Sequence, residues 1–344
     1  MNILIKIIEK LRKILKSLEK KEKNLINFII FLKNIKNKNK FNFFYDDSIL
    51  KKNKDFFKKK NLWPKKIAAC IIFSYNPNRF FFLSKICKAI EKINSNTDIT
   101  LIVDKEGFLK KNTIKKFISK TTKININFFY PKNLLDPRLL TYSHFEVFKK
   151  KIKSKKYTHF LYLEDDILIN ENNIKYWMVA RKALKNTKLI PVFLRTEINF
   201  KNKKNYLVDS TRKNLFFFQS KLINNLKNIA FVNLFNFFTP TYFYDRELMI
   251  EHLSGPSSSI DFGHGTFNSD YINPNMIELG VMERAATLLA YKDVPLGFFH
   301  RNVVPVNIKS KLLKDYCLIK HLSNRFTNEK RSNFGKIPVK KLFY

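Results

Sequence analysis

KYTHFLYLEDDI, residues 156–167, joins a short apolar run to three consecutive carboxylates. The run Phe160–Leu163 has the length and the aromatic and branched residues of a buried strand. Glu164–Asp166 follows at once, where such a strand should end and enter a loop. Because ligands of open α/β sheets bind at the carboxyl ends of the strands, we expect these three side chains to lie at a ligand site.

Three adjacent anions repel one another unless a cation or hydrogen-bond donors hold them. Carboxylate oxygens suit Mg²⁺ or Mn²⁺, and these ions usually share their coordination sphere with substrate phosphates. The alternative is a solvated acidic turn after a strand. The tripeptide alone leaves both interpretations open.

The segments upstream predict alternating strands and helices. Ile67–Phe73 reads as a buried strand, a helix is expected over Phe80–Ile93, and Thr97–Val103 reads as the next strand. This order is typical of a mainly parallel sheet flanked by helices, which makes the fold class α/β.

Polar residues follow both of these strands. Ser74, Asn76 and Arg79 belong to the turn after the first strand, and Asp104 stands at the end of the second. Such a turn offers backbone N–H groups to phosphates, and an acidic residue at this place accepts from a ribose or base. A turn or helix-cap role for Asp104 is the alternative. The chain lacks both the glycine-rich fingerprint of dinucleotide folds and a phosphate loop.

In this order the segments resemble GT-A glycosyltransferases, and the Glu-Asp-Asp tripeptide is similar to that of N-acetylglucosaminyltransferase I and its relatives. The resemblance covers roughly Ile67 to Ile167. It implies a Rossmann-like sheet and a nucleotide-sugar donor. Asp166 would ligate Mn²⁺ or Mg²⁺ with Glu164 and Asp165 in support, and the residues of the first turn and Asp104 would contact the donor.

A second block of special residues lies between Thr239 and Asn302. Gly255, Gly263 and Gly265 fall in a long polar stretch of a chain that has only seven glycines. Long loops of this kind inside a domain are commonly functional. The resemblance implies an acceptor-binding or gating loop here.

The resemblance also implies a catalytic base after that loop, because inverting enzymes of this type place a carboxylate near the start of a helix there. Glu278 and Glu283 are the candidates, and we favour Glu283, which falls within the helix expected from Val281 to Leu288. A general base in this position would deprotonate the acceptor hydroxyl. An ordinary surface pair with Arg284 is the alternative reading of Glu283.

A histidine near the end of the domain often completes the metal site of GT-A enzymes. Pro295–Asn302 reads as the last strand, and His300 is the predicted metal ligand, with His264 as its competitor. Arg301 would meet the diphosphate of the nucleotide sugar.

Composition constrains partners and compartment. The net charge of +38 favours anionic partners in general, yet abundant Lys, Asn, Ile and Phe indicate an AT-biased coding sequence, so nucleic acid is not the expected partner. The three cysteines show no paired or metal-binding spacing, which fits a reducing compartment. We expect a cytoplasmic protein, peripheral at the inner membrane face if its basic amphipathic N-terminus binds lipid.

The sequence therefore predicts three parts: a basic helical extension over residues 1–63, a GT-A domain over 64–306 and a basic tail over 307–344 with a helix from Ser310 to Leu322. The expected function is metal-dependent transfer of a sugar, with inversion and a UDP-sugar favoured, to a glycan or lipid-linked acceptor. A sugar nucleotidyltransferase and a non-catalytic basic protein that binds nucleic acid or membrane are the alternatives.

Overall fold

The computed structural model divides the chain into two compact units, Met1–Phe44 and Tyr45–Tyr344. It describes residues 43–45, 63–94, 96–132, 134, 136–209, 220–222, 229–234, 239–255, 258–259, 280–295, 298, 300–307, 310, 312–330 and 332–342. A short strand, β1 (Phe43–Tyr45), lies at the boundary between the units, and all other described elements belong to the second unit. The predicted extension over residues 1–63 falls almost wholly outside the described residues.

The first sheet carries the segments expected from the sequence. Its strand order is β12-β5-β2-β3-β4, formed by β12 (Tyr242–Asp245), β5 (His159–Glu164), β2 (Ile67–Phe73), β3 (Thr97–Val103) and β4 (Ile126–Phe129). All neighbours run parallel except β12, which pairs antiparallel with β5. Every residue of β2 is buried, because helices cover both faces of the sheet.

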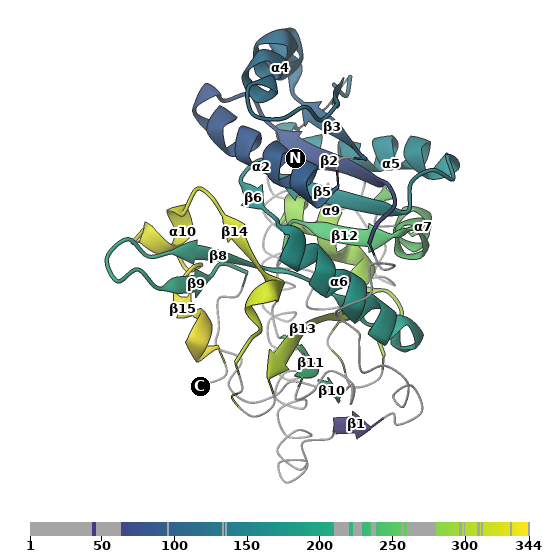
Figure 1. Cartoon of the computed structure of the whole chain (residues 1–344), viewed down its shortest axis with the longest axis vertical. Helices are drawn as coiled ribbons and strands as arrows, with labels where there is room; N and C mark the ends of the chain where they lie inside the picture. The colour runs from purple at the N-terminus through teal and green to yellow at the C-terminus, as the bar shows by residue number, and fades with distance from the viewer. Residues whose placement is uncertain are drawn as a thin grey trace, which may run out of the picture. The chain divides into compact units, whose positions relative to one another are not determined.

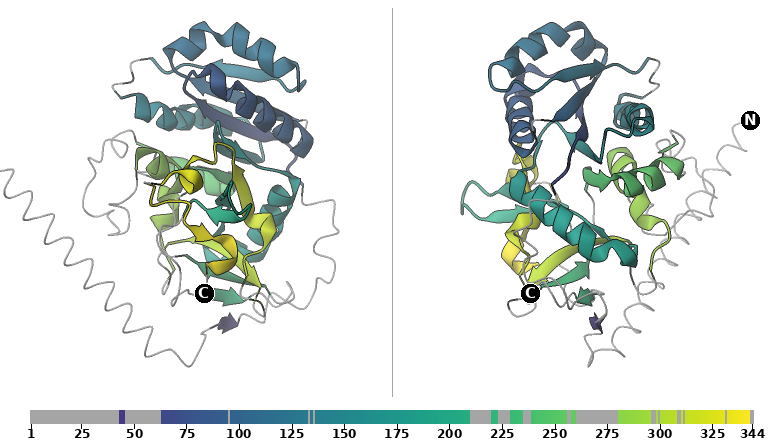
Figure 2. Two further views of the ribbon diagram at one scale, coloured as in Figure 1. Left: turned by 90° about the vertical axis from the view of Figure 1, so that its left-hand side faces the viewer. Right: turned by 45° about the vertical axis from the view of Figure 1, so that its right-hand side comes forward.

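Helices pack on both faces of this sheet (Figure 1). Helix α2 (Phe80–Ile93), with α3 (Lys105–Leu109) and α4 (Lys111–Ser119), lies on one face, while α5 (Ser143–Lys153) lies on the other (Figure 2). This arrangement follows from right-handed crossovers, since the chain moves from β2 to β4 in one direction and returns to β5 in the other. The predicted α/β class with a mostly parallel sheet flanked by helices is confirmed.

Two further sheets complete the unit. One has the order β15-β9-β8-β14-β6, from β15 (Ile337–Pro338), β9 (Asn205–Leu207), β8 (Leu194–Ile198), β14 (Leu318–His321) and β6 (Ile167–Leu168). The other contains β10 (Ser220–Leu222), β11 (Ile229–Asn233), β13 (Asn302–Asn307) and β7 (Ile190–Pro191) in that order. The remaining helices are α6 (Glu171–Leu184), α7 (Arg246–Ser254), α9 (Val281–Thr287) and α10 (Arg325–Asn328).

The C-terminal residues differ from the sequence prediction. The helix expected over Ser310–Leu322 is wrong, because Leu318–His321 forms β14 between β8 and β6. The expected strand over Pro295–Asn302 is displaced, since β13 begins at Asn302. The residues assigned to a basic tail therefore supply strands to the same unit as the rest of the domain.

The three cysteines are free thiols in the core, which agrees with the absence of a disulfide pattern in the sequence. In the described part of the chain, no helix has the length and apolar character needed to cross a bilayer.

Candidate active site

The acidic tripeptide forms the link between two sheets. Glu164 ends β5 in the first sheet, and Ile167 begins β6 in the second. Asp165 and Asp166 occupy the turn between these strands, and both are buried. The carboxylates therefore lie at the carboxyl end of a central strand, as the sequence predicts, but they are enclosed rather than solvated.

Each of the three carboxylates has one oxygen beside a cation and one oxygen without a partner. Glu164 Oε2 lies 3.7 Å from Arg195 Nη1, while Asp165 Oδ1 and Asp166 Oδ2 both contact a cation more closely. The second oxygens, Glu164 Oε1, Asp165 Oδ2 and Asp166 Oδ1, are buried and have no hydrogen-bond partner among the described residues. Because buried polar groups are normally paired, three such oxygens in consecutive residues are candidates to bind an external cation or donor group.

Arg79 bridges the two aspartates. Its Nη2 lies 2.8 Å from Asp165 Oδ1 and 2.5 Å from Asp166 Oδ2. Arg79 precedes α2 in the turn after β2, so the sheet order brings it next to the end of β5. Its side chain is 31% exposed, which leaves the guanidinium accessible from solvent. The structure thus joins Arg79 to the acidic tripeptide.

Arg195 holds the other end of the tripeptide. This buried arginine on β8 donates from its backbone N–H and its Nε to the two carboxylate oxygens of Asp209, and it also faces Glu164. Asp209 has no exposed surface. The carboxylate of Asp209 neutralises Arg195 and fixes the direction of its guanidinium. Arg195 on β8 is therefore held in the orientation that faces Glu164.

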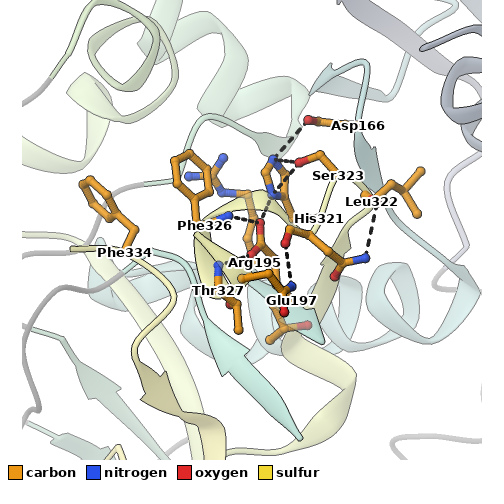
Figure 3. Close-up of polar contacts among 12 residues, drawn as sticks. Asp166, Arg195, Glu197, His321, Leu322, Ser323, Phe326, Thr327 and Phe334 are labelled. Atoms are coloured by element: carbon orange, nitrogen blue, oxygen red, sulfur yellow. Dashed lines mark hydrogen bonds and ion pairs between the residues drawn. The ribbon is translucent and has the colours of Figure 1, made fainter. Parts of the chain in front are cut away.

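His321 contacts Asp166 from β14, which lies between β8 and β6 in the second sheet. His321 Nε2 lies 3.1 Å from Asp166 Oδ2, and Nδ1 lies 2.5 Å from Glu197 Oε1 (Figure 3). Pairing of β14 with β6 sets this contact, because it places His321 opposite Ile167, the residue after Asp166. The backbone N–H of Leu322 also donates to the Asp166 carbonyl at 2.7 Å.

Glu197 contacts the His321 ring at Nδ1, on the side away from Asp166, and is itself fixed by backbone hydrogen bonds. Its Oε2 accepts from the backbone N–H of Thr327 at 2.6 Å, and its Oε1 accepts from Phe326 N–H at 3.3 Å. The Phe326 ring stacks on His321 with a centroid distance of 5.5 Å (Figure 3). An imidazole with a carboxylate at each nitrogen satisfies both only when it is doubly protonated and cationic.

These contacts separate the pKa values of the carboxyls. Burial raises the pKa of Asp165 to about 8 and that of Glu164 to about 7, against the opposing charges of Arg79 and Arg195. Burial also acts to raise the pKa of Asp166, but the hydrogen bond and charge of His321, with Arg79 and Arg195, outweigh it and lower that pKa to about 2. Asp166 is therefore the ionised member of the tripeptide at neutral pH.

His321 shows the matching shift. Burial acts to lower the pKa of His321, but its hydrogen bonds to Asp166 and Glu197 prevail and raise it. The cation that faces Asp166 is thus stabilised by both carboxylates that flank it.

Glu283 lies in the same electrostatic neighbourhood. Its charge contributes to the raised pKa of Glu164 and that of Arg195, and also to the raised pKa of Tyr162, whose largest cause is burial. Glu283 is half-buried in the first turn of α9, the helix predicted from the sequence. A Cβ atom on Gly280 would lie 2.5 Å from Glu283 Oε2, so the glycine provides the space for this carboxylate.

Ser74, Asn76 and Asp104 lie together at the ends of β2 and β3. Asp104 Oδ2 accepts from Ser74 Oγ and from Tyr75 N–H, both at 2.9 Å, and its Oδ1 accepts from Gly107 N–H as the N-cap of α3. Asn76 caps the turn that ends at Arg79 by accepting from Asn78 N–H. Asp104 therefore has the helix-cap role that the sequence analysis gave as the alternative. Its contact with a nucleotide stays a prediction.

His300 and Arg301 lie before β13, in a different sheet from the tripeptide. His300 Nε2 donates to the Leu234 carbonyl at 2.7 Å, and its Nδ1 accepts from Asn302 N–H at 3.1 Å. Arg301 is paired through two nitrogens with Glu251 of α7. None of the contacts described for these two residues reaches Glu164, Asp165 or Asp166, and among the described histidines His321 contacts the acidic tripeptide. The roles of His300 and Arg301 stay predictions.

Two other predicted site residues, Glu278 and His264, lie outside the described residues, as does the glycine-rich stretch over 260–279. Their expected roles therefore stay predictions.

The described residues fit a divalent cation in one specific manner. No group of three or more His, Cys, Asp or Glu side chains in the described part of the chain is arranged to enclose a metal ion. Mg²⁺ and Mn²⁺ sites of nucleotide enzymes commonly use only one or two carboxylates, with substrate phosphates and waters as further ligands. Asp166 Oδ1, which has no partner among the described residues and belongs to an ionised carboxylate, would meet that requirement, whereas Asp165 would first have to lose a proton.

Four residues of the site were not found from the sequence: Arg195, Glu197, Asp209 and His321. Arg195 and Glu197 are two residues apart in Leu194–Ile198 and so share one strand face, while Leu194 and Ile198 lie on the other face with Thr196, a pattern that predicts one charged strand face. Because Arg195 and Glu197 are buried, that face is a polar site and not a solvated surface.

Comparison with known proteins gives only distant likenesses. No protein-family model matches the chain, and no curated protein matches it. Among solved structures, the mannosyltransferase PcManGT from Pyrobaculum calidifontis in complex with GDP-Man and Mn²⁺ has a TM-score of 0.37 and 9% identity, over 85% of this chain and 64% of that chain. HddC from Yersinia pseudotuberculosis complexed with GMP-PN has a TM-score of 0.31 and 10% identity, over 56% and 81% of the two chains. TarS 1–349 from S. aureus has a TM-score of 0.31 and 11% identity, over 54% of this chain and about half (49%) of that one.

The raised pKa values of Asp165 and Glu164 predict a pH-dependent stability. Unfolded Asp and Glu titrate near pH ~4, so the folded protein holds more protons up to the raised values of about 8 and 7. Its free energy of unfolding must then fall as pH rises through this interval, and the raised pKa of His321 acts in the same direction. In metal-free buffer, the melting temperature of the wild type should fall between about pH 5 and 8, and Asp165→Asn should flatten this slope. Equal slopes in the two proteins would contradict the shift assigned to Asp165.

Proposed function

We propose that this protein is a metal-dependent glycosyltransferase of the GT-A type. It transfers a sugar from a nucleotide-sugar donor, with a UDP-sugar favoured, to a glycan or lipid-linked acceptor, and inversion is favoured over retention. The observation that supports this function is the row of three carboxylates at the carboxyl end of β5, two of them buried and Glu164 half-buried, each with one oxygen beside an internal cation and one buried oxygen that has no partner among the described residues.

Asp166 is the proposed principal metal ligand, through the unpartnered Oδ1. Its low pKa of about 2 keeps it ionised at neutral pH, as a ligand for a hard cation requires. His321 is the proposed second ligand; because its ring is doubly protonated between Asp166 and Glu197, it would release the Nε2 proton when the metal binds, while Glu197 keeps the ring in place through Nδ1. A bound Mn²⁺ or Mg²⁺ would neutralise charge on the diphosphate leaving group.

Arg79 is the proposed contact for the donor diphosphate. Its guanidinium is already held beside Asp165 and Asp166 and is partly exposed. A guanidinium presents several N–H donors in one plane and suits phosphate oxygens. Ser74, Asn76 and Asp104, on the adjoining turns, would contact the nucleoside.

Glu283 is the proposed general base. It would accept the proton of the acceptor hydroxyl while that oxygen bonds to the anomeric carbon and the bond from this carbon to the diphosphate oxygen breaks. Its electrostatic coupling to Glu164 and Arg195 supports a place near the reacting groups. Arg195 would neutralise the charge of Glu164, so that Glu164 does not repel the carboxylate of Glu283.

The proposed function predicts donor binding that requires metal. In a thermal-shift panel of UDP-, GDP-, CMP- and dTDP-sugars with and without Mn²⁺, one nucleotide class should raise the melting temperature only when Mn²⁺ is present. Asp166→Ala should abolish this shift, whereas Asp136→Ala, which removes a carboxylate that pairs with the exposed Arg138, should retain it. Stabilisation that persists in EDTA would indicate a metal-independent enzyme. Stabilisation by a nucleoside triphosphate with a sugar phosphate would favour a nucleotidyltransferase.

Two histidine variants decide which ring serves the metal. His321→Gln should weaken Mn²⁺ affinity, measured by calorimetry with a donor nucleotide present, and His300→Gln should leave it unchanged. Glu197→Gln retains the ring but removes its charged partner, so a loss of about 10- to 100-fold in Mn²⁺ affinity is expected. The opposite result, with His300→Gln alone weakening the metal, would restore the sequence prediction.

Substitution of the general base should lower kcat, whereas substitution of the metal ligand should weaken donor binding. Glu283→Gln should preserve donor binding and lower kcat by ~10²- to 10⁴-fold, because a general base acts in the transition state. Glu278→Gln is the matched control and should leave kcat nearly unchanged. If the effects are reversed, Glu278 is the base. If neither variant lowers kcat, the base lies elsewhere or the enzyme retains configuration.

A further inference from the structure

The β8–β9 hairpin carries an exposed apolar and basic tip. Ile198 is 40% exposed and Phe200 is 57% exposed. Lys201, Lys203 and Lys204 follow, all exposed, and no acidic residue occurs between Ile198 and Tyr206. Exposed single apolar residues are common on soluble proteins, but here two of them share a hairpin with three uncompensated lysines.

The tip is ordered by its own asparagines. Asn199 Oδ1 accepts from the backbone N–H groups of Lys201 and Asn202, and its backbone pairs with that of Lys204. Asn202 accepts from Lys204 N–H and donates to the Tyr206 hydroxyl. These hydrogen bonds fix the backbone of the turn while the side chain of Phe200 stays exposed. The backbone of the tip would therefore lose little conformational entropy when it contacts a surface.

Helix α10 braces the hairpin on one side. Asn324 Oδ1 accepts from Ile198 N–H at 2.8 Å, and Asn328 bonds both Phe200 N–H and the Ile198 carbonyl. Figure 1 shows the loop between β8 and β9 extending beyond α10 at the end of these two strands. A projecting tip of this kind is suited to a flat surface. It is unlike the basic grooves with stacked aromatic rings that bind single-stranded nucleic acid.

We propose that this hairpin contacts an anionic phospholipid membrane. Phe200 and Ile198 would enter the interface between headgroups and acyl chains, while the three lysines meet the lipid phosphates. A protein partner of mixed charge would require acidic or hydrogen-bonding side chains to match, and this turn uses its asparagines internally. The surface is distinct from the basic N-terminal segment, and the lipid contact stands whether or not the site transfers a sugar.

The contact would also orient the site. Arg195 and Glu197 lie on β8, the strand that ends at Ile198. Because a strand is stiff over this length, a membrane bound at the tip fixes the direction in which the site faces. An acceptor carried on a lipid would then approach from the side of the hairpin.

A local probe separates this surface from the rest of a strongly basic chain. All three native cysteines are buried, so Asn205→Cys in β9, opposite Ile198, can be labelled with an environment-sensitive NBD dye. Asn112→Cys, exposed on α4, serves as the matched control on the full chain. With vesicles of phosphatidylserine and phosphatidylcholine, NBD at position 205 should shift to the blue and be quenched by brominated acyl chains, and NBD at 112 should not.

Three results would overturn the proposal. The first is that the dye at 205 does not respond although the chain binds vesicles. The second is that both dyes respond equally, and the third is that neither responds. A response at 205 that depends on protein concentration without lipid would assign the surface to a second copy of the chain, and this also overturns the membrane contact.

Matched substitutions give an independent measure of affinity. Phe200→Ser should weaken vesicle binding about tenfold, whereas Phe81→Ser, which removes a phenylalanine that is also 57% exposed, should have an effect of about twofold or less. The triple change Lys201→Gln, Lys203→Gln and Lys204→Gln should cost about fivefold for each lysine. The same loss of charge at Lys110, Lys115 and Lys116 on and before α4 is the control. Equal losses in the two triple variants would show that only net charge matters, and would refute a specific contact.

Discussion

Three consecutive carboxylates at the buried end of β5 impose the constraint on which the rest of the site depends. Carboxyl groups this close together are tolerated in a folded chain only if cations reach them or some of them hold a proton, and here the raised pKa of Asp165 accompanies the cations. The cations come from three places, the turn after β2, strand β8 and strand β14, as Arg79, Arg195 and His321. The tripeptide therefore ties together segments that are far apart in sequence, and the second sheet is positioned against the first at this point.

The choice of arginine for buried positions fits this constraint. Arg181, Arg195 and Arg301 are buried among the described residues, and no described lysine is. Each pairs with a carboxylate, Arg181 with Asp245, Arg195 with Asp209 and Arg301 with Glu251. A guanidinium forms several directional hydrogen bonds and is less strongly hydrated than an ammonium. The described lysines lie at exposed or half-buried positions, as the compositional interpretation expected.

Local patterns were sufficient for the first half of the fold. The bounds of β2, α2 and β3 agree with those expected from apolar runs and polar turns, since these elements are set by nearby residues. The second sheet could not be foreseen in the same manner. Glu197 and His321 are 124 residues apart, and the spacing of apolar residues before His321 is also compatible with a helix. Pairing with β8 and β6 decides the strand, and such pairing has no local signature.

The same limit applies to the site. Glu164, Asp165, Asp166 and Arg79 were selected because turns after strands mark ligand sites. His321 was not considered, because the sequence predicted a helix over Ser310–Leu322 where the structure has β14. Glu283 was selected from its place in a helix, and its electrostatic coupling to Glu164 and Arg195 depends on contacts that only the folded chain reveals.

Gly280 has a consequence for how this site varies. The carboxylate of Glu283 occupies space that any side chain at 280 would fill, since a Cβ there would meet Oε2 at 2.5 Å. An alanine at 280 would move the carboxylate without altering a charge, a titrating group or a ligand contact. The geometry of the site is thus adjustable through a chemically silent position, one that an inventory of charged residues would pass over.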